Sequence, residues 1–329
     1  MIVRQARYSV VERGGNPIFS RILFAFSLLI SGRLALAQRA IPDDNLAYPV
    51  LINLTDCANN VNSIQGTGFF LNTPSAVYLV TARHVLFNEA VLVVQNQPRQ
   101  LQCKRAELRS YSKNPNEHQM NRFSLDLQAL SDAGKVKAHS THDVAVVQVA
   151  VVAAATPAPA PTVPPAVPKP ANAVEGETVT VIPGVLINQS APSGILGVSL
   201  SVVEKFDQVL TPNDIYVFGY PASIGLQQAP QIDYNTPLLR KGIIAGTNGA
   251  NRTIVLDCMT FHGNSGGPVL EVIREGFQNR FRLIGVVSQY VPVAETWVNT
   301  AQSYYNMQLY NSGYSIAEPM DPVLELVAQ

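Results

Sequence analysis

The sequence contains few charged residues and no excess of either sign. Of its 329 residues, 23 are Lys or Arg and 23 are Asp or Glu, which amounts to 14% and a formal net charge of zero. Soluble globular domains carry about 25% charged residues. Disordered chains combine low hydrophobicity with high net charge, and binding of nucleic acid through bulk charge requires a basic excess. Because the apolar share is an ordinary 47%, we expect a folded chain with no nucleic-acid partner.

Cysteine is also scarce. The three cysteines, Cys57, Cys103 and Cys258, show no CxxC spacing and are too few for a scaffold built on disulfides. In an oxidising compartment one pair could form a bridge, and we favour Cys57–Cys103. Cys258 lies in an apolar run, which is typical of a buried thiol. The chain is long enough for one large domain or two modest ones.

No apolar run is long enough to form a membrane-spanning helix, which needs about 20 residues. The run at residues 22–30 follows several arginines and precedes Ala35-Leu36-Ala37, a small-x-small pattern that signal peptidases accept. We therefore predict a signal peptide at residues 1–37, cleaved near Ala37, and a secreted or periplasmic protein with no stable membrane span after cleavage. A buried core strand or helix at 22–30 is the alternative, and Arg33 and the long basic region favour it.

Short strand-like runs dominate from residue 48 onward. They are rich in Val, Leu, Tyr and Phe and are bounded by Asn, Pro, Gly or Ser, a pattern typical of all-β proteins. The runs are 48–54, 66–71, 76–82, 90–95, 143–152, 178–183, 195–203, 214–220, 242–247, 253–259, 282–288 and 314–318. The last residues, 319–329, predict a short helix beginning at Asp321, because Pro322 falls at a helix start, where a missing N–H does no harm.

Residues 153–176 contain seven of the 23 prolines. Proline cannot donate to a sheet ladder, and alternating Ala-Pro favours an extended polyproline conformation. We predict that this segment links two antiparallel β-barrels or sandwiches, one at 38–152 and one at 177–318. A long exposed loop and a proline-rich ligand for a partner module are the alternatives.

The strongest chemical signal is Phe261-His262-Gly263-Asn264-Ser265-Gly266-Gly267-Pro268. Its glycines permit a tight turn and close approach of a ligand to the backbone. A serine centred in such a turn can present its hydroxyl beside converging N–H groups, which is how an oxyanion hole is built. An ordinary glycine-rich hairpin loop is the structural alternative.

A serine nucleophile needs a base, and the sequence has five histidines. His84 ends a buried strand-like run, which would aim it, whereas the others lie in polar or turn-like contexts: His118, His139, His142 and His262. The base in turn needs an acid to orient it. Asp143 opens the most apolar run, and a carboxylate there is costly unless it has a partner. A strand-capping Asp in a turn is the alternative for Asp143.

The motifs GTGFFL, LVTARHVL, HDVAVVQV, FGYP and GNSGGP, in this order, resemble the chymotrypsin-like serine proteases. They are most similar to bacterial trypsin-like peptidases of the Deg/HtrA type, without the PDZ domain that many of those carry. The resemblance implies two antiparallel β-barrels with the site between them. It also implies His84 as general base, Asp143 as orienting acid, Ser265 as nucleophile, and the N–H groups of Gly263 and Ser265 as the oxyanion hole.

The same resemblance places Met259 and Thr260 in the specificity pocket, Ser288 on the strand that pairs with substrate, and His262 at the border of the cleft. A thioether does not bind a cation as a carboxylate does, so we expect small or medium apolar side chains rather than Lys or Arg. Asn264 replaces the aspartate that pairs with a freed N-terminus in the digestive proteases, so we expect no activation through an N-terminal amine.

These observations predict an exported serine endopeptidase that acts on proteins or peptides and needs no metal or organic cofactor. The alternative is a protease-fold module that binds peptides or proteins with little or no catalysis. The sequence does not indicate an oligomeric state.

Overall fold

The structure is a computed structural model, and it describes residues 41–57, 64–89, 99–154, 177–222, 229–276, 278–302 and 304–329. Residues 43–329 form one compact unit. The predicted signal peptide and the expected strand at 90–95 lie outside the described residues. Within the described ranges, no helix has both the length and the apolar character needed to cross a membrane.

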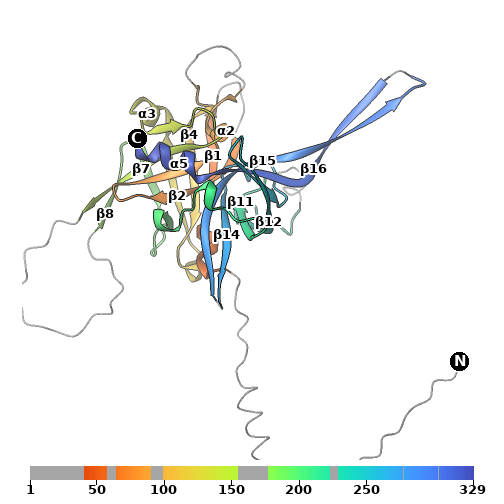
Figure 1. The fold of residues 1–329 in the computed structure, drawn as a ribbon. Helices are drawn as coiled ribbons and strands as arrows, with labels where there is room; N and C mark the ends of the chain where they lie inside the picture. Colours follow the sequence, from red (N-terminus) through yellow and green to blue (C-terminus); the bar gives the residue numbers. More distant parts are fainter. Residues whose placement is uncertain are drawn as a thin grey trace, which may run out of the picture. The chain divides into compact units, whose positions relative to one another are not determined.

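Two β-sheets make up most of the compact unit, as the strand-like runs predict (Figure 1). The first sheet has ten strands, and the order along its main path is β6-β7-β3-β2-β1-β4-β5-β9. Its strands are β1 (Val50–Cys57), β2 (Ile64–Asn72), β3 (Ala76–Thr81), β4 (Cys103–Tyr111), β5 (Met120–Asp126), β6 (Val136–Ala138), β7 (Ala145–Ala154), β8 (Glu177–Val181), β9 (Val185–Gln189) and β10 (Gly197–Ser199).

The first sheet curls around one apolar core. Buried side chains from seven of its strands belong to a single cluster that includes Ile52, Phe70, Leu79, Leu108 and Phe123. β8 pairs with β7 near one end of the path, and β9 pairs with β5 at the other end. Because only residues 182–184 separate β8 from β9, this short connection brings the two ends of the sheet together.

The proline-rich segment does not separate the two sheets. Ala154 at the end of β7 pairs with Glu177 at the start of β8, so the segment joins two neighbouring strands of the first sheet. The predicted boundary is therefore wrong, since β8, β9 and β10 all lie in the first sheet and not in the second barrel. Composition indicates a linker there, but strand pairing continues on both sides of it.

The second sheet is a closed barrel with the strand order β11-β12-β13-β16-β15-β14. Its strands are β11 (Asp214–Gly219), β12 (Leu238–Asn248), β13 (Thr253–Asp257), β14 (Pro268–Glu275), β15 (Gln278–Asn299) and β16 (Tyr304–Pro319). Alternate residues of these strands, among them Ile215, Val217, Ile254 and Leu256, point into one buried core. The all-β fold with two sheets is thus confirmed.

A C-terminal helix follows the barrel, as predicted. α5 (Met320–Ala328) begins one residue before the expected start, buries Val323 and Leu326, and packs against β7 and β15. The expected strand at 195–203 is instead β10 followed by the 3-10 helix η5 (Leu200–Val202). The other short helices are η1 (Asp43–Ala47), α2 (Arg83–Leu86), η4 (Pro115–Glu117), α3 (Leu127–Asp132) and η6 (Phe206–Gln208).

β15 and β16 continue past the barrel as a two-stranded ribbon (Figure 1). Their ladder extends from Gly285↔Pro319 in the barrel to Asn299↔Tyr304 near the tip. The sequence predicts strands only at 282–288 and 314–318, which are the parts of the ladder buried in the barrel. The outer part is exposed on both faces, so it has no pattern of buried and exposed side chains to indicate a strand.

Candidate active site

His84 lies on α2, directly after the buried strand β3. Arg83 holds this turn against the loop that carries Asp143. Its backbone N–H donates to the Asp143 carbonyl (3.2 Å), and its guanidinium donates to the carbonyls of His139 and His142 (2.9 Å each). Its side chain also forms an ion pair with Glu89 (2.7 Å). The helical turn and the Asp143 loop are therefore joined by several hydrogen bonds.

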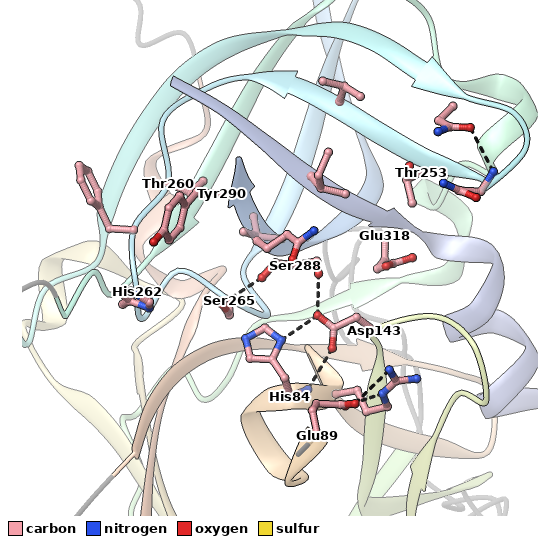
Figure 2. Close-up of a pocket in the computed structure, with 18 of the residues that line it drawn as sticks. His84, Glu89, Asp143, Thr253, Thr260, His262, Ser265, Ser288, Tyr290 and Glu318 are labelled. Atoms are coloured by element: carbon pink, nitrogen blue, oxygen red, sulfur yellow. Dashed lines mark hydrogen bonds and ion pairs between the residues drawn. The ribbon is translucent and has the colours of Figure 1, made fainter. Parts of the chain in front are cut away.

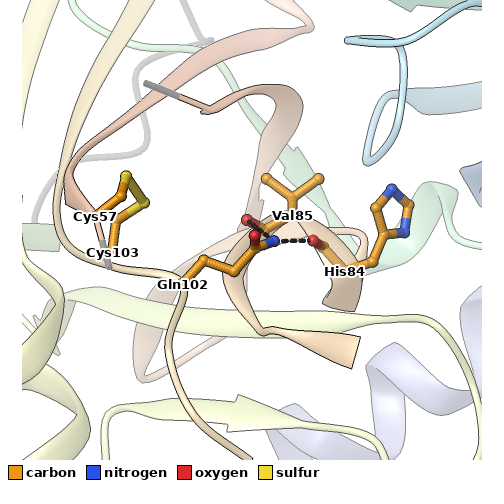
Figure 3. The surroundings of a disulfide bond; sticks show 5 residues. All are labelled: Cys57, His84, Val85, Gln102 and Cys103. Atoms are coloured by element: carbon orange, nitrogen blue, oxygen red, sulfur yellow. Dashed lines mark hydrogen bonds between the residues drawn. A yellow bond between two sulfur atoms is a disulfide. The ribbon is translucent and has the colours of Figure 1, made fainter. Parts of the chain in front are cut away.

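A second set of contacts holds the other side of the His84 turn (Figure 3). The side-chain amide of Gln102 donates to the His84 carbonyl at 2.5 Å and to the Val85 carbonyl at 3.4 Å. The next residue, Cys103, forms a disulfide with Cys57 across the β1–β4 ladder. This is the pair that the sequence analysis favours, and it fixes the strand end that carries Gln102. Cys258 is free and buried, and burial raises the pKa of its thiol to about 11.

His84 and Asp143 contact each other twice (Figure 2). Nδ1 of His84 lies 2.7 Å from Oδ2 of Asp143, and the backbone N–H of His84 donates to Oδ1 at 3.0 Å. The Asp143 side chain is 17% exposed. Burial acts to raise the pKa of Asp143, but the hydrogen bonds and charge of His84 and a hydrogen bond from Ser288 outweigh it, so this pKa is below its ordinary value. The carboxylate is thus held ionised beside the imidazole.

Ser288 contacts both Asp143 and Ser265. Its hydroxyl donates to Oδ2 of Asp143 at 2.6 Å, and its carbonyl accepts a hydrogen bond from Oγ of Ser265 at 3.1 Å. The sequence analysis assigned Ser288 to substrate binding. The structure adds that its side chain orients the acid.

The loop around Ser265 requires glycine at two positions in particular. Gly263 has φ +90°, and a Cβ there would lie 2.3 Å from the Tyr220 carbonyl oxygen. Gly266 has φ +88°, and a Cβ there would lie 2.0 Å from the Thr67 carbonyl oxygen. Both the conformation and the space exclude other side chains. The loop therefore packs directly against the backbone of β2 in the first sheet and against the backbone that follows β11 in the second.

The N–H groups of His262, Gly263 and Ser265 in this loop have no acceptor in the described part of the chain, and the last two are the predicted oxyanion-hole donors. In a trans peptide the N–H and C=O point in opposite directions, so anchoring the carbonyl also aims the amide. The carbonyl of His262 accepts from the N–H of Ala222 at 2.7 Å, and that of Asn264 accepts from the N–H of Gly267 at 2.9 Å. The N–H groups of Gly263 and Ser265 are thus each fixed from the opposite side of their own peptide.

Thr67 is a site residue that the sequence analysis missed. Its hydroxyl donates to the Gly263 carbonyl (2.6 Å) and accepts from the N–H of Tyr220 (3.0 Å). Its own N–H donates to the Ser265 carbonyl (2.9 Å). It is fully buried and links the first sheet to the serine loop. The only available signal was its place between two glycines in the GTGFFL motif.

Asn264 stabilises the same loop. Its side-chain oxygen accepts a hydrogen bond from the N–H of Phe261 at 3.0 Å, and the residue is buried. The uncharged side chain of Asn264 therefore stabilises the turn through a hydrogen bond within the loop.

A cleft of about 700 Å³ brings the predicted residues together. Its lining includes His84, Asp143, Ser265, Thr260, His262 and Ser288. Met259 is 39% exposed and is not among the residues that line this cleft. Side chains alternate across an extended backbone, and here the buried Thr260 faces the cleft.

The remaining wall of the cleft is polar and aromatic. The rings of His262 and Tyr290 meet edge to face at 5.6 Å. Glu318 also lines the cleft, but its carboxylate lies 2.6 Å from Nδ1 of His142. Among the described residues, no group of three or more His, Cys, Asp or Glu side chains is arranged to hold a metal ion.

No protein-family model matches the chain, and no curated protein matches its sequence. Several solved structures are similar to it. They include the HtrA-type protease AlgW with a tripeptide (13% identity, TM-score 0.42, 86% of this chain and 60% of that one). A serine endoprotease from Yersinia pestis is 11% identical (TM-score 0.41, 88% and 67%). The thermostable serine protease AL20 from an extremophilic microorganism is 10% identical (TM-score 0.42, 86% and 96%).

All three are proteases. The chain spans 60% of the length of AlgW. At this level of similarity, what the chain does has to be inferred from the geometry of its own site.

Proposed function

We propose that the chain is an exported serine endopeptidase that hydrolyses peptide bonds through an acyl-enzyme. The observation that carries this proposal is the convergence of His84, Asp143 and Ser265 on one cleft, beside two N–H groups without an acceptor. A binding module has no need of a buried, ionised carboxylate behind a histidine. This arrangement matches the general template for a serine triad.

The chemistry follows from the roles of the three side chains. His84 takes the proton of the Ser265 hydroxyl while Oγ bonds to the substrate carbonyl carbon. The imidazolium, stabilised by Asp143, then gives that proton to the leaving amine as the C–N bond breaks. His84 next takes a proton from water, whose oxygen attacks the acyl carbon, and returns that proton to Ser265 Oγ. The N–H groups of Gly263 and Ser265 would bind the oxyanion at both steps.

One side chain has to move before this reaction. Ser265 Oγ bonds to the Ser288 carbonyl and not to His84. Rotation between staggered χ1 positions is an ordinary side-chain change, and catalytic hydrogen bonds often tighten only when substrate binds. The same observation favours the alternative, a peptide-binding module in which Ser265 stays turned away from its base.

A fluorophosphonate probe separates these two functions, because it labels only an activated serine. We expect the wild type to be labelled, Ser265→Ala to be unlabelled and Ser131→Ala, on α3, to be labelled normally. His84→Ala should lose labelling while the matched control His118→Asn, in an exposed loop, keeps it. Absence of labelling of folded wild-type protein would favour the binding module.

The proposed substrate is a protein or peptide whose side chain next to the scissile bond is small or medium and apolar. Thr260 and His262 line the cleft, and each of the three carboxylates that line it already has a partner: Glu89 with Arg83, Asp143 with His84 and Glu318 with His142. Cleavage of a peptide library tests this proposal, and a strong preference for Lys or Arg would contradict it.

The proposed location is outside the cytoplasm. The Cys57–Cys103 disulfide supports it, because such bonds persist in oxidising compartments. N-terminal sequencing of the protein recovered from the periplasm or medium should begin near Gln38. Recovery of a chain that still begins with Met1 would contradict cleavage.

A further inference from the structure

The outer ribbon of β15 and β16 is unusually apolar for an exposed structure. From Tyr290 to Tyr314 the sequence has a single charged residue, Glu295, and it includes the only tryptophan of the chain, Trp297. Trp297 is 60% exposed and Tyr305 is 74% exposed. An isolated two-stranded ribbon is marginally stable in water, and large exposed apolar patches mark sites of interaction.

One face of the ribbon carries no charge at all. Residues paired across an antiparallel ladder point to the same side. The pairs Ala294↔Leu309, Thr296↔Met307 and Val298↔Tyr305 therefore share one face. Glu295 lies on the other face, paired with Gln308.

The outer edge of β15 is free along the ribbon. β14 pairs with β15 only as far as Val286, and the last backbone bonds on that side join Val287 to Gly266 and Gly267. Beyond Val287, no other strand of the described residues pairs with this edge. The edge is therefore open from Ser288, beside the nucleophile, to Asn299.

The position of Pro292 shows which residues of β15 point their backbone N–H and C=O groups away from β16. Proline has no N–H to donate, so its position in the ladder is one where the N–H would face away from β16. The register is unbroken from Pro292 to Asn299. Alternate residues share an orientation, so Ala294, Thr296 and Val298 also present their N–H and C=O groups to the free edge.

We propose that this edge binds the acyl side of the substrate as an added β-strand, well beyond the residues next to the scissile bond. This inference rests on the proposed function. The leaving amine receives its proton from His84, which is attached to the first sheet. The acyl side of the substrate therefore lies on the other side of the cleft, along β15. Its chain then runs toward the cleft while β15 runs away from it, so the pairing is antiparallel.

The substrate class follows from the face that this pairing extends. Substrate residues directly opposite Ala294, Thr296 and Val298 place their side chains on the uncharged face of the ribbon. Backbone pairing with pockets for alternate side chains is a general mode of peptide recognition. The preferred substrate is thus an extended, unfolded segment with apolar residues at every second position on the acyl side.

The test compares two fluorogenic peptides with the same residues around the scissile bond. One has three acyl-side residues, opposite residues 288–290, and the other has eleven, which by the same residue-by-residue pairing lie opposite residues 288–298. We expect kcat/KM to be about tenfold higher for the long peptide, as a few net backbone hydrogen bonds and apolar contacts would give. A long peptide with Lys at the alternate positions should lose this advantage.

Two proline variants locate the binding edge. Thr296→Pro removes an outward N–H from β15, and Met307→Pro, its ladder partner, removes one from the opposite edge. Thr296→Pro should reduce the long-to-short ratio of kcat/KM to near one, and Met307→Pro should leave the ratio unchanged. Equal effects of the two variants, or no effect of Thr296→Pro, would overturn the proposal.

The two proposals can fail separately. Fluorescence anisotropy of the labelled long peptide with Ser265→Ala measures binding without catalysis, so the ribbon is tested even if the wild type shows no labelling by fluorophosphonate. Binding that is weakened by adding Thr296→Pro supports the ribbon site. Light scattering that shows a wild-type dimer dissociated by Thr296→Pro would mean that the edge pairs with a second copy, and would also overturn the proposal.

Discussion

Replacing Thr67 with valine tests how the two sheets cooperate at the site. Valine keeps the shape of threonine but removes the hydroxyl that bonds to the Gly263 carbonyl and the Tyr220 N–H. Leaving a buried polar group without a partner costs about 1–3 kcal/mol. With two such groups, we expect the free energy of unfolding to fall by about 2–6 kcal/mol.

Activity should fall as well, because the Gly263 carbonyl lies between the two proposed oxyanion donors. Removing one donor outright costs about 10²–10³ in kcat. Loosening the peptide between them should cost less, about 10- to 100-fold in kcat/KM, with KM little changed. Thr67→Ser, which keeps the hydroxyl, should restore most of the loss.

Thr73 offers a matched control. Its hydroxyl also donates to one carbonyl and accepts from one N–H, both of Ala76, but it lies in the β2–β3 turn away from the cleft. Urea denaturation and steady-state hydrolysis of a short peptide measure the two effects. If Thr73→Val and Thr67→Val lower kcat/KM equally, or Thr67→Val leaves it unchanged, the proposed link between Thr67 and the oxyanion hole is refuted.

Three further predictions concern stability. The pKa of Asp143 is lowered from the ordinary 3.8. Its contribution to the free energy of unfolding is therefore present above pH 3.8 and is lost as the pH falls through the lower pKa of the folded state. Because the Ser288 hydroxyl helps to lower that pKa, Ser288→Ala should move the loss to higher pH in acid titrations of unfolding. Burial raises the pKa of Glu271 from 4.5, so its contribution is full below pH 4.5 and is lost as pH rises through the folded value. The free energy of unfolding of Glu271→Gln, measured relative to wild type, should therefore be higher at pH 8 than at pH 4. The same difference from wild type at both pH values would contradict this. Replacing Cys57 and Cys103 together by alanine should lower the free energy of unfolding by about 2–4 kcal/mol, and an unchanged urea midpoint would refute it.

Sequence reasoning worked best where local chemistry and strand pattern coincide. His84 follows a buried strand, Asp143 opens another, and Ser265 sits among glycines that permit a turn closed to other residues. The structure brings these three residues to one cleft. Each was recognisable because its residue type is costly or unusual in its local context.

Features that depend on pairing between distant segments could not be predicted. Thr67 looks like an ordinary strand residue until the second barrel places Gly263 and Tyr220 against it. Met259 and Thr260 are adjacent in sequence just after β13, and only the fold decides which one faces the cleft. The ribbon beyond Tyr290 has no buried face, so hydrophobic periodicity gave no reason to expect a strand there.

The pairing of Ala154 with Glu177 makes the junction between β7 and β8 a natural place for the protein to change length. Both ends of the intervening segment are held by the same ladder, and the entropic cost of closing a loop rises only slowly with its length. A change in the length of this segment should therefore leave the cleft unaltered. The junction is equally suited to engineering, as a position to insert a reporter domain or to substitute a short turn.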